Sequence, residues 1–303
     1  MNKTKQFSGI IPPVSTLFTD DGILDKVRMG GVIDFLIRSG VDGLFFLGTG
    51  GEFSQMSTEE RKQVAEFSVN YVDKRVPTLI GTGSTNTREA IELSTHAQSI
   101  GASGIVVINP YYWQLTEDNL FNYFSEVSSS VDLPVILYNF PNLTGQDLSP
   151  AFVKSLVDKN INIVGIKETI DSIAHLREMI FSLKDEHPNF SVFCGFDDHL
   201  LNTLLLGGDG AISASANFVP ELSIDIFQAF SSGDLGQAAE LHKTLLQLPL
   251  IYKIDSPFVN VVKEAMKLCG QDISTYSLPP TRSLSEEKRE QVKRILQNAN
   301  IVR

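Results

Sequence analysis

The feature that most constrains the fold of this 303-residue chain is a repeat of short apolar runs, rich in β-branched and aromatic residues. The runs recur about every thirty residues, and an amphipathic segment follows each, which is typical of βα units on a parallel sheet. We predict eight strands, at 9–16, 42–47, 78–81, 104–108, 135–139, 163–167, 191–195 and 210–214. Helical patterns lie between them, for example at 27–38, 58–72 and 87–100.

Capping signals support this alternation. Ser57 followed by Glu60 resembles a capping box, and Ser149 before Pro150 offers an N-cap with proline at the first helical position. No GxGxxG motif opens the first unit, and the eight strands occupy about 220 residues, so a closed barrel fits better than an open doubly wound sheet. The sequence therefore predicts an α/β fold, a (β/α)₈ TIM barrel.

The strand signals stop near residue 231. Three helical patterns follow, at 235–252, 257–268 and 285–298. We expect a catalytic barrel domain over residues 1–230 and a C-terminal helical extension over 231–303, which either packs on the barrel or forms an oligomer contact.

Charge and composition exclude several functions. A net charge of −11 leaves no basic stripe for neutralising phosphates, so nucleic-acid binding is not expected. The segment from Met1 to Gly9 is polar and lacks the apolar run of a signal peptide, and no later segment is long and apolar enough to span a membrane. A cytoplasmic location follows as an expectation.

Metal and cofactor motifs are not found in the sequence. Cys194 and Cys269 lack CxxC spacing, and the five histidines show neither HxH nor HExxH spacing. The one candidate cluster is Asp197, Asp198 and His199, which is too small a ligand set to predict a metal enzyme. We expect neither a metal nor an organic cofactor.

One lysine stands at the carboxyl end of a predicted buried strand. Lys167 closes the apolar run at 163–167. A buried amine must pair with an anion or lose its charge, and an uncharged amine can attack a carbonyl to form a Schiff base. A salt bridge to a neighbour such as Glu168 is the structural alternative.

Other polar residues follow the predicted strands and should share one rim with Lys167, because barrel active sites lie at the carboxyl ends of the strands. They are Thr49, Gly50 and Gly51 after the second strand, Tyr111 and Tyr112 after the fourth, Tyr138 in the fifth, Thr169 after the sixth, and Gly195, Asp197 and Asp198 after the seventh.

These residues suggest how a substrate would be held. Backbone N–H groups of the turn at 48–51, with the Thr49 hydroxyl, could cradle a carboxylate, unless the turn is merely structural. Tyr138 is either a core aromatic residue or a proton carrier. Asp197 and Asp198 suit hydrogen bonds to sugar hydroxyls, or form an acidic pair at a helix N-terminus. No Lys or Arg occurs between Asp185 and His242, which disfavours a phosphorylated substrate.

Four motifs, taken together, resemble the dihydrodipicolinate synthase / N-acetylneuraminate lyase family over essentially the whole chain. They are Gly48-Thr49-Gly50-Gly51-Glu52, Tyr111-Tyr112, Tyr138-Asn139-Phe140-Pro141 with Thr144-Gly145, and Gly165-Ile166-Lys167-Glu168-Thr169.

The resemblance implies a class I, pyruvate-handling barrel enzyme that forms a homotetramer, a dimer of dimers. Lys167 matches the Schiff-base lysine and Tyr138 the tyrosine that transfers protons. Thr49 and the amides of Gly50 and Gly51 match the binder of the 2-oxo acid carboxylate. Tyr112 matches a tyrosine that a neighbouring subunit contributes in many members. Thr169, Gly195 and Asp197 match positions that contact the polyol in the sugar-acid lyases.

Departures from the family pattern narrow the substrate. Leu143 replaces the arginine that binds the aldehyde substrate's carboxylate in the synthase, Gly50 replaces the second threonine of its glycine-rich motif, and Ala214 replaces a serine that contacts the sugar chain in the neuraminate lyase. The chain most resembles the bacterial 2-keto-3-deoxygluconate aldolases of this family, through the combination of Thr49-Gly50-Gly51, Asn109-Pro110-Tyr111-Tyr112-Trp113 and Asn139-Phe140-Pro141-Asn142-Leu143-Thr144-Gly145.

The resulting hypothesis is a Schiff-base lyase that cleaves a 2-keto-3-deoxy sugar acid, such as 2-keto-3-deoxygluconate, to pyruvate and an aldehyde. The same lysine could serve a dihydrodipicolinate synthase or a sugar-acid dehydratase. A non-catalytic 2-oxo-acid sensor is the alternative from another class.

Overall fold

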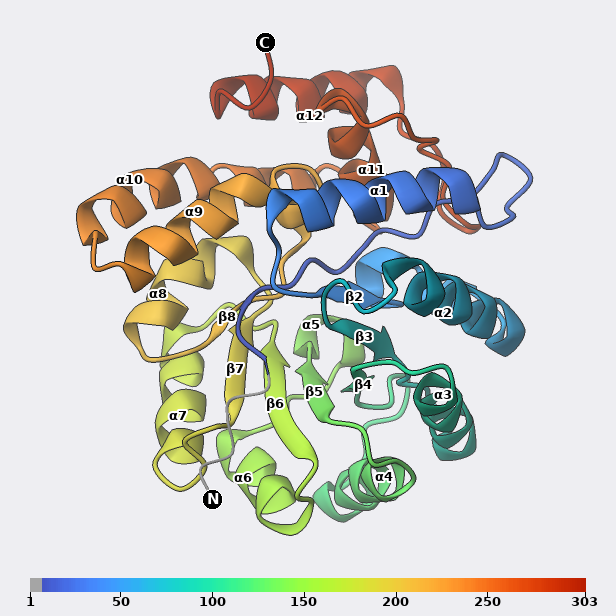
Figure 1. The fold of residues 1–303 in the computed structure, drawn as a ribbon, viewed down its shortest axis with the longest axis vertical. Helices are drawn as coiled ribbons and strands as arrows, with labels where there is room; N and C mark the ends of the chain where they lie inside the picture. Colours follow the sequence, from blue (N-terminus) through green and yellow to red (C-terminus); the bar gives the residue numbers. More distant parts are fainter. Residues whose placement is uncertain (1–6) are drawn as a thin grey trace.

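Eight parallel strands form a ring at the centre of the molecule, as the sequence predicts. The computed structural model describes residues 7–303, and its sheet has the order β1-β8-β7-β6-β5-β4-β3-β2 (Figure 1). The strands are β1 Gly9–Ile10, β2 Leu44–Phe46, β3 Thr78–Gly81, β4 Gly104–Ile108, β5 Val135–Asn139, β6 Ile163–Glu168, β7 Ser191–Cys194 and β8 Gly210–Ala211.

The ring closes between the first two strands through irregular backbone pairing. Val14 N–H donates to the Phe45 carbonyl at 2.8 Å, and Phe45 N–H donates to the Pro12 carbonyl at 3.0 Å. Pro12 and Pro13 have no N–H to donate, so a regular ladder cannot run through them. This is why β1 ends at Ile10, although the apolar run predicts a strand over 9–16.

Most helices surround the ring on its outside, whereas the short α5 is drawn within the outline of the ring (Figure 1). The helices of the barrel are α1 Lys26–Ser39, α2 Thr58–Val72, α3 Thr87–Ser99, α4 Glu117–Ser129, α5 Pro141–Thr144, α6 Pro150–Lys159, α7 Ile173–Lys184, α8 Leu200–Leu205 and α9 Pro220–Ser231. Both capping signals are confirmed, since Ser57 and Glu60 form a reciprocal capping box and Ser149 caps α6. Short 3₁₀ turns follow several strands, including η1 Thr49–Gly51, η3 Asp197–His199 and η4 Ala214–Asn217.

The C-terminal segment is helical, but its first predicted helix is wrong. α10 covers Leu235–Leu245, and a separate 3₁₀ segment, η5 Leu248–Lys253, follows it. Pro249 cannot donate the backbone hydrogen bond that a continuous α-helix over 235–252 requires. α11 Val259–Leu268 and α12 Glu286–Asn298 complete the chain, and α12 lies at the top of the view, beyond α1 (Figure 1). The division into domains 1–230 and 231–303 stays a prediction.

None of the helices in residues 7–303 combines the length and the apolar character that crossing a membrane requires. The polar amino-terminal segment, from which the sequence predicts that no signal peptide is present, lies mostly outside the described residues.

Candidate active site

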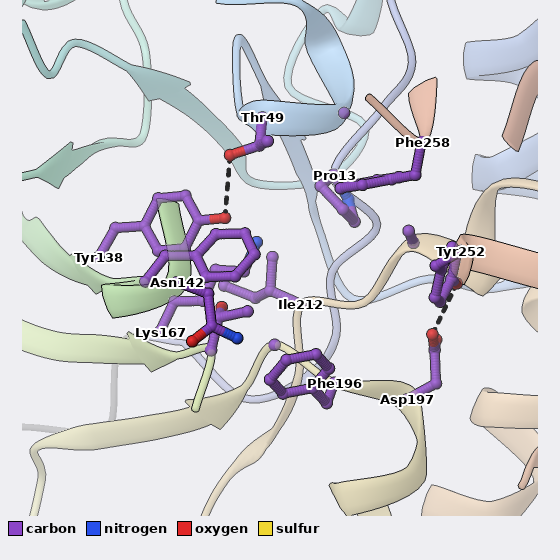
Figure 2. A pocket seen from close by; sticks show the side chains of 15 residues that line it. Pro13, Thr49, Tyr138, Asn142, Lys167, Phe196, Asp197, Ile212, Tyr252 and Phe258 are labelled. Carbon is purple, nitrogen blue, oxygen red and sulfur yellow. Dashed lines mark hydrogen bonds between the residues drawn. The ribbon is translucent and has the colours of Figure 1, made fainter. Parts of the chain in front are cut away.

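Lys167 and Tyr138 lie side by side at the carboxyl ends of neighbouring strands. They are register partners in the β5–β6 ladder, so both side chains reach the same end of the barrel. Lys167 is 4% exposed. Its Nζ lies 4.2 Å from the centre of the Tyr138 ring (Figure 2). The centre of the Phe45 ring lies 5.5 Å from the same nitrogen. Aromatic faces attract a cation weakly and also suit an uncharged amine.

Lys167 forms no salt bridge within residues 7–303. Glu168 is the next residue of the strand and so points to the opposite face, where Asn139 Nδ2 donates to its Oε2 at 3.1 Å. His175 Nδ1 lies 3.4 Å from the same oxygen. The alternative of a Lys167–Glu168 ion pair is therefore wrong, because strand geometry separates the two side chains.

Thr49 connects the glycine-rich turn to this pair. Its Oγ1 lies 3.1 Å from the Tyr138 hydroxyl, and either group can donate (Figure 2). A proton can therefore pass between Tyr138 and Thr49 without a large movement. The structure brings Lys167, Tyr138 and Thr49 together, as the sequence predicts.

These three residues line a cavity of about 180 Å³ at the mouth of the barrel. The wall combines polar groups with an apolar surface supplied by several segments. Its residues are Pro13, Thr49, Gly50, Tyr138, Phe140, Asn142, Lys167, Thr169, Gly195, Phe196, Asp197, Ile212, Ala214, Tyr252 and Phe258.

The glycine-rich turn, which the sequence predicts as a carboxylate cradle, lies at the cavity. Gly50 lines the cavity, but Gly51 does not. The Gly51 N–H donates to the Gly48 carbonyl at 2.9 Å, because residues 49–51 form a 3₁₀ turn. The Gly51 amide is thus engaged within the turn, whereas the Thr49 hydroxyl and Gly50 face the cavity.

Thr169 and Gly195 form a close contact on the cavity wall. The Thr169 hydroxyl is buried and has no hydrogen-bond partner among residues 7–303, so it is available to a bound molecule. A Cβ built on Gly195 would lie 1.9 Å from Thr169 Oγ1, which leaves room only for glycine. These positions fit the expected contacts with a sugar chain.

Asp197 lines the cavity, but its carboxylate is largely occupied. It accepts hydrogen bonds from the Ser215 backbone N–H at 3.2 Å and from the Tyr252 hydroxyl at 2.6 Å, and also from the Ser215 hydroxyl (Figure 2). A carboxylate has about four lone-pair positions, so little capacity remains for a substrate hydroxyl. Burial raises the pKa of Asp197, against the effect of the hydrogen bonds from Ser215 and Tyr252. Asp197 also begins η3, as its structural alternative predicts.

Tyr112 is not brought to Lys167 within one chain. Its side chain is 89% exposed, packs against the exposed Trp113 and does not line the cavity. A role in catalysis would require Tyr112 to reach the site of a neighbouring subunit.

Sequence reasoning missed the contribution of the C-terminal segment to the site. Tyr252 in η5 and Phe258 before α11 both line the cavity, and Tyr252 holds Asp197. No local pattern marks them, because the apolar spacing at 235–252 is equally typical of a helix far from the site. Asn142, Phe196 and Ile212 also line the cavity, and Phe196 lies within the run after the seventh strand that the sequence singles out.

Within residues 7–303, no group of three or more His, Cys, Asp or Glu residues is arranged to hold a metal ion. The Asp197 and His199 side chains have different partners: Asp197 accepts from Ser215 and Tyr252, whereas His199 Nε2 contacts Asp171 at 3.2 Å. The site has acid–base and nucleophilic groups of its own: a buried amine, a phenol and a hydroxyl around one cavity.

Comparisons with known proteins agree with this geometry. Residues 6–299 match the Dihydrodipicolinate synthetase family. The chain is 60% identical over 301 residues to the "Putative 2-dehydro-3-deoxy-D-gluconate aldolase YagE" of Escherichia coli (strain K12), which covers 99% of this chain and 100% of that protein. It is also 60% identical over 288 residues to the "Probable 2-dehydro-3-deoxy-D-pentonate aldolase YjhH" of the same organism, which covers 95% and 96%.

A crystal structure of YagE in complex with pyruvate is similar to this fold, with a TM-score of 0.97 and 61% identity over 97% of this chain and 99% of that one. The chain belongs to the dihydrodipicolinate synthetase family.

Proposed function

We propose that this protein is a class I aldolase that cleaves an unphosphorylated 2-keto-3-deoxy sugar acid to pyruvate and an aldehyde. The observation that carries the proposal is the buried amine of Lys167, without a carboxylate partner in the described chain, beside Tyr138 in the cavity at the mouth of the barrel. The names of the two relatives at 60% identity, and the pyruvate in the YagE crystal structure, support the substrate class.

The mechanism follows from the positions of the side chains. The Lys167 amine attacks the 2-oxo carbon and forms an iminium ion after loss of water, and this ion accepts the electrons of the C3–C4 bond. Tyr138, linked to Thr49, removes the proton of the C4 hydroxyl, so that the bond breaks and the aldehyde leaves. Protonation of the lysine-bound enamine at C3, followed by hydrolysis, releases pyruvate and restores Lys167. Thr49 and Gly50 are placed to hold the substrate carboxylate.

A condensing synthase and a dehydratase use the same iminium ion and remain alternatives. The side chain of Leu143 cannot clamp a second carboxylate as an arginine would, which disfavours the synthase. Assays of a sugar-acid panel, with pyruvate plus aspartate semialdehyde as a separate test, distinguish the three. An aldolase yields pyruvate and an aldehyde, a dehydratase yields a dehydrated oxo acid, and a synthase consumes pyruvate together with aspartate semialdehyde.

The test of the proposal is borohydride trapping with pyruvate, followed by mass spectrometry of the labelled peptide and by turnover of 2-keto-3-deoxygluconate and 2-keto-3-deoxypentonate. We expect the label on Lys167 and release of pyruvate. Lys159, an exposed lysine of α6, gives the matched control, and Lys159→Ala should behave as the wild type. Trapping without turnover of any sugar acid would favour the sensor, and a label on another residue would refute the proposal.

We further propose that the protein forms a homotetramer in which Tyr112 of one subunit reaches the site of another. Three large apolar side chains are exposed in this region: Tyr112, Trp113 and Leu143. Such a group of side chains is typical of a surface that another subunit covers. Sedimentation velocity, together with the activity of Tyr112→Phe, tests this assembly. The cytoplasmic location stays a prediction.

A further inference from the structure

A fully buried ion pair joins the glycine-rich turn to the C-terminal segment. Lys263 Nζ donates to Glu52 Oε1 at 2.5 Å, and both side chains are 0% exposed. Glu52 directly follows the turn at 49–51, and Lys263 lies in the middle of α11. The pair thus connects two segments that are 211 residues apart in the sequence.

The remaining polar atoms of this pair are also satisfied. Lys263 Nζ donates to the Tyr276 carbonyl at 2.7 Å, and Glu52 Oε2 accepts from the Leu278 backbone N–H at 2.7 Å. The Phe18 ring covers the ammonium, 5.1 Å from its centre. Both oxygens of one carboxylate therefore hold the C-terminal segment. Removing one member would leave a buried charge without a partner, which is strongly unfavourable.

The backbone at Glu52 has a conformation that few residues other than glycine adopt. Glu52 has φ 61°, in the left-handed region that favours glycine and that costs another residue roughly 1 kcal/mol. Its N–H closes the turn by donating to the Thr49 carbonyl at 3.1 Å. The position of Glu52 thus fixes the backbone of Thr49, whose hydroxyl meets Tyr138 at 3.1 Å.

We propose that Glu52 and Lys263 are positioning residues for the proton-transfer step. The pair holds the turn at the place where the Thr49 hydroxyl contacts the Tyr138 hydroxyl, so α11 becomes part of the catalytic apparatus although Lys263 itself does not line the cavity. This inference rests on the proposed function, because it assigns the pair to the step in which Tyr138 removes a proton.

The experiment separates positioning from stability by replacing both charges at once. Glu52→Gln with Lys263→Met removes the two charges and keeps similar volumes, so the double variant should fold, as circular dichroism and thermal unfolding will show. Sugar-acid cleavage is then measured in four proteins: the wild type, Thr49→Val, the double variant and the triple variant.

We expect the double variant to lower kcat about tenfold or more, since a small displacement of an aligned group is costly. Borohydride trapping of pyruvate on Lys167 should continue, because the pair does not contact that lysine. In the Thr49→Val background the same two substitutions should lower kcat less than about twofold, since they act through Thr49.

The control is Lys288→Met, which breaks the more exposed pair with Asp255 in the same C-terminal segment and should leave kcat unchanged. Equal losses of kcat with and without the Thr49 hydroxyl, or wild-type kcat in a folded double variant, would overturn the positioning role. Failure of the wild type to trap pyruvate would instead refute the proposed function.

Discussion

Two buried lysines of this molecule have opposite surroundings. Lys263 is 0% exposed and is held by the Glu52 carboxylate and the Tyr276 carbonyl. Lys167 is 4% exposed and faces aromatic rings, without a carboxylate within salt-bridge distance in the described chain. Both lie over an aromatic ring, so aromatic contact does not distinguish them.

The two lysines differ in whether a carboxylate lies beside the side-chain nitrogen. A buried lysine that is paired with a carboxylate is held in place and fixes the backbone around it. A buried lysine that opens on a cavity and has no matching anion can act as a nucleophile. Burial alone therefore does not identify a reactive lysine. The groups around the side-chain nitrogen decide its role.

The largest effect is expected at Lys167. Lys167→Ala should abolish pyruvate trapping and lower kcat for the sugar acid by at least about 10³-fold, because the covalent step is lost. Its unfolding free energy should stay within about 1 kcal/mol of the wild-type value. Steady-state kinetics and chemical denaturation measure the two quantities. Substantial remaining turnover would mean that another group forms the adduct.

Lys263 should show the reverse pattern. Lys263→Met alone should lower the unfolding free energy by about 3–5 kcal/mol, since Glu52 is left buried without its cation. The folded fraction should still trap pyruvate on Lys167. Denaturant unfolding with an unchanged m-value measures this loss. A Lys263→Met variant that is as stable as the wild type but does not trap pyruvate would contradict the structural role of Lys263.

A substitution at Tyr138 tests whether its hydroxyl transfers protons in the reaction. Tyr138→Phe keeps the ring under the amine but removes the hydroxyl that meets Thr49. We expect kcat to fall about 10²-fold, while trapping with pyruvate continues at a lower rate. Stopped-flow trapping and steady-state assays on the same preparation separate the two steps. An unchanged kcat would assign the proton transfer elsewhere.

The smallest effect on activity is expected at Glu168, which is next to Lys167 in the strand but points away from it. Burial raises the pKa of Glu168 from 4.5 to about 8, against the opposing effects of His175 and Asn139. Between these values the folded protein retains a proton that the unfolded chain has released, so folding stability falls as the pH rises through this window.

Glu168→Gln cannot titrate at this position. Its stability relative to the wild type should therefore grow with pH by about 1.4 kcal/mol per unit within the window, the value for one proton. Denaturation of both proteins at pH 5, 6, 7 and 8 measures the difference. If the difference in unfolding free energy is the same at all four pH values, Glu168 is ionised throughout this range, which contradicts the prediction.

The local elements are the part of the fold that could be predicted well from the sequence. The strands at 78–81, 104–108 and 135–139 and the helix at 58–72 have the predicted bounds, because an apolar run or a capping box marks each of them. The first strand is shorter than predicted, and the helix at 235–252 is interrupted. In both places proline removes a backbone donor, a local effect that outweighs apolar spacing.

Of the candidate site, Lys167, Tyr138 and Thr49 could be found from their place at strand ends, because parallel strands bring their carboxyl ends to one edge. The engagement of the Gly51 amide and the occupation of Asp197 could not be found in this way. Each depends on a hydrogen bond whose partner lies in a turn or in a distant segment.

The repeat of eight βα units and the residues at the ends of the strands could be read from the chain, since apolar period and capping are local properties of the sequence. Which buried lysine has an anion depends on the folded structure. Glu52 and Lys263 meet across 211 positions of the sequence, whereas Glu168, the immediate neighbour of Lys167, points to the other side of the strand. Electrostatic pairing depends on distance in space, and separation along the chain does not measure that distance.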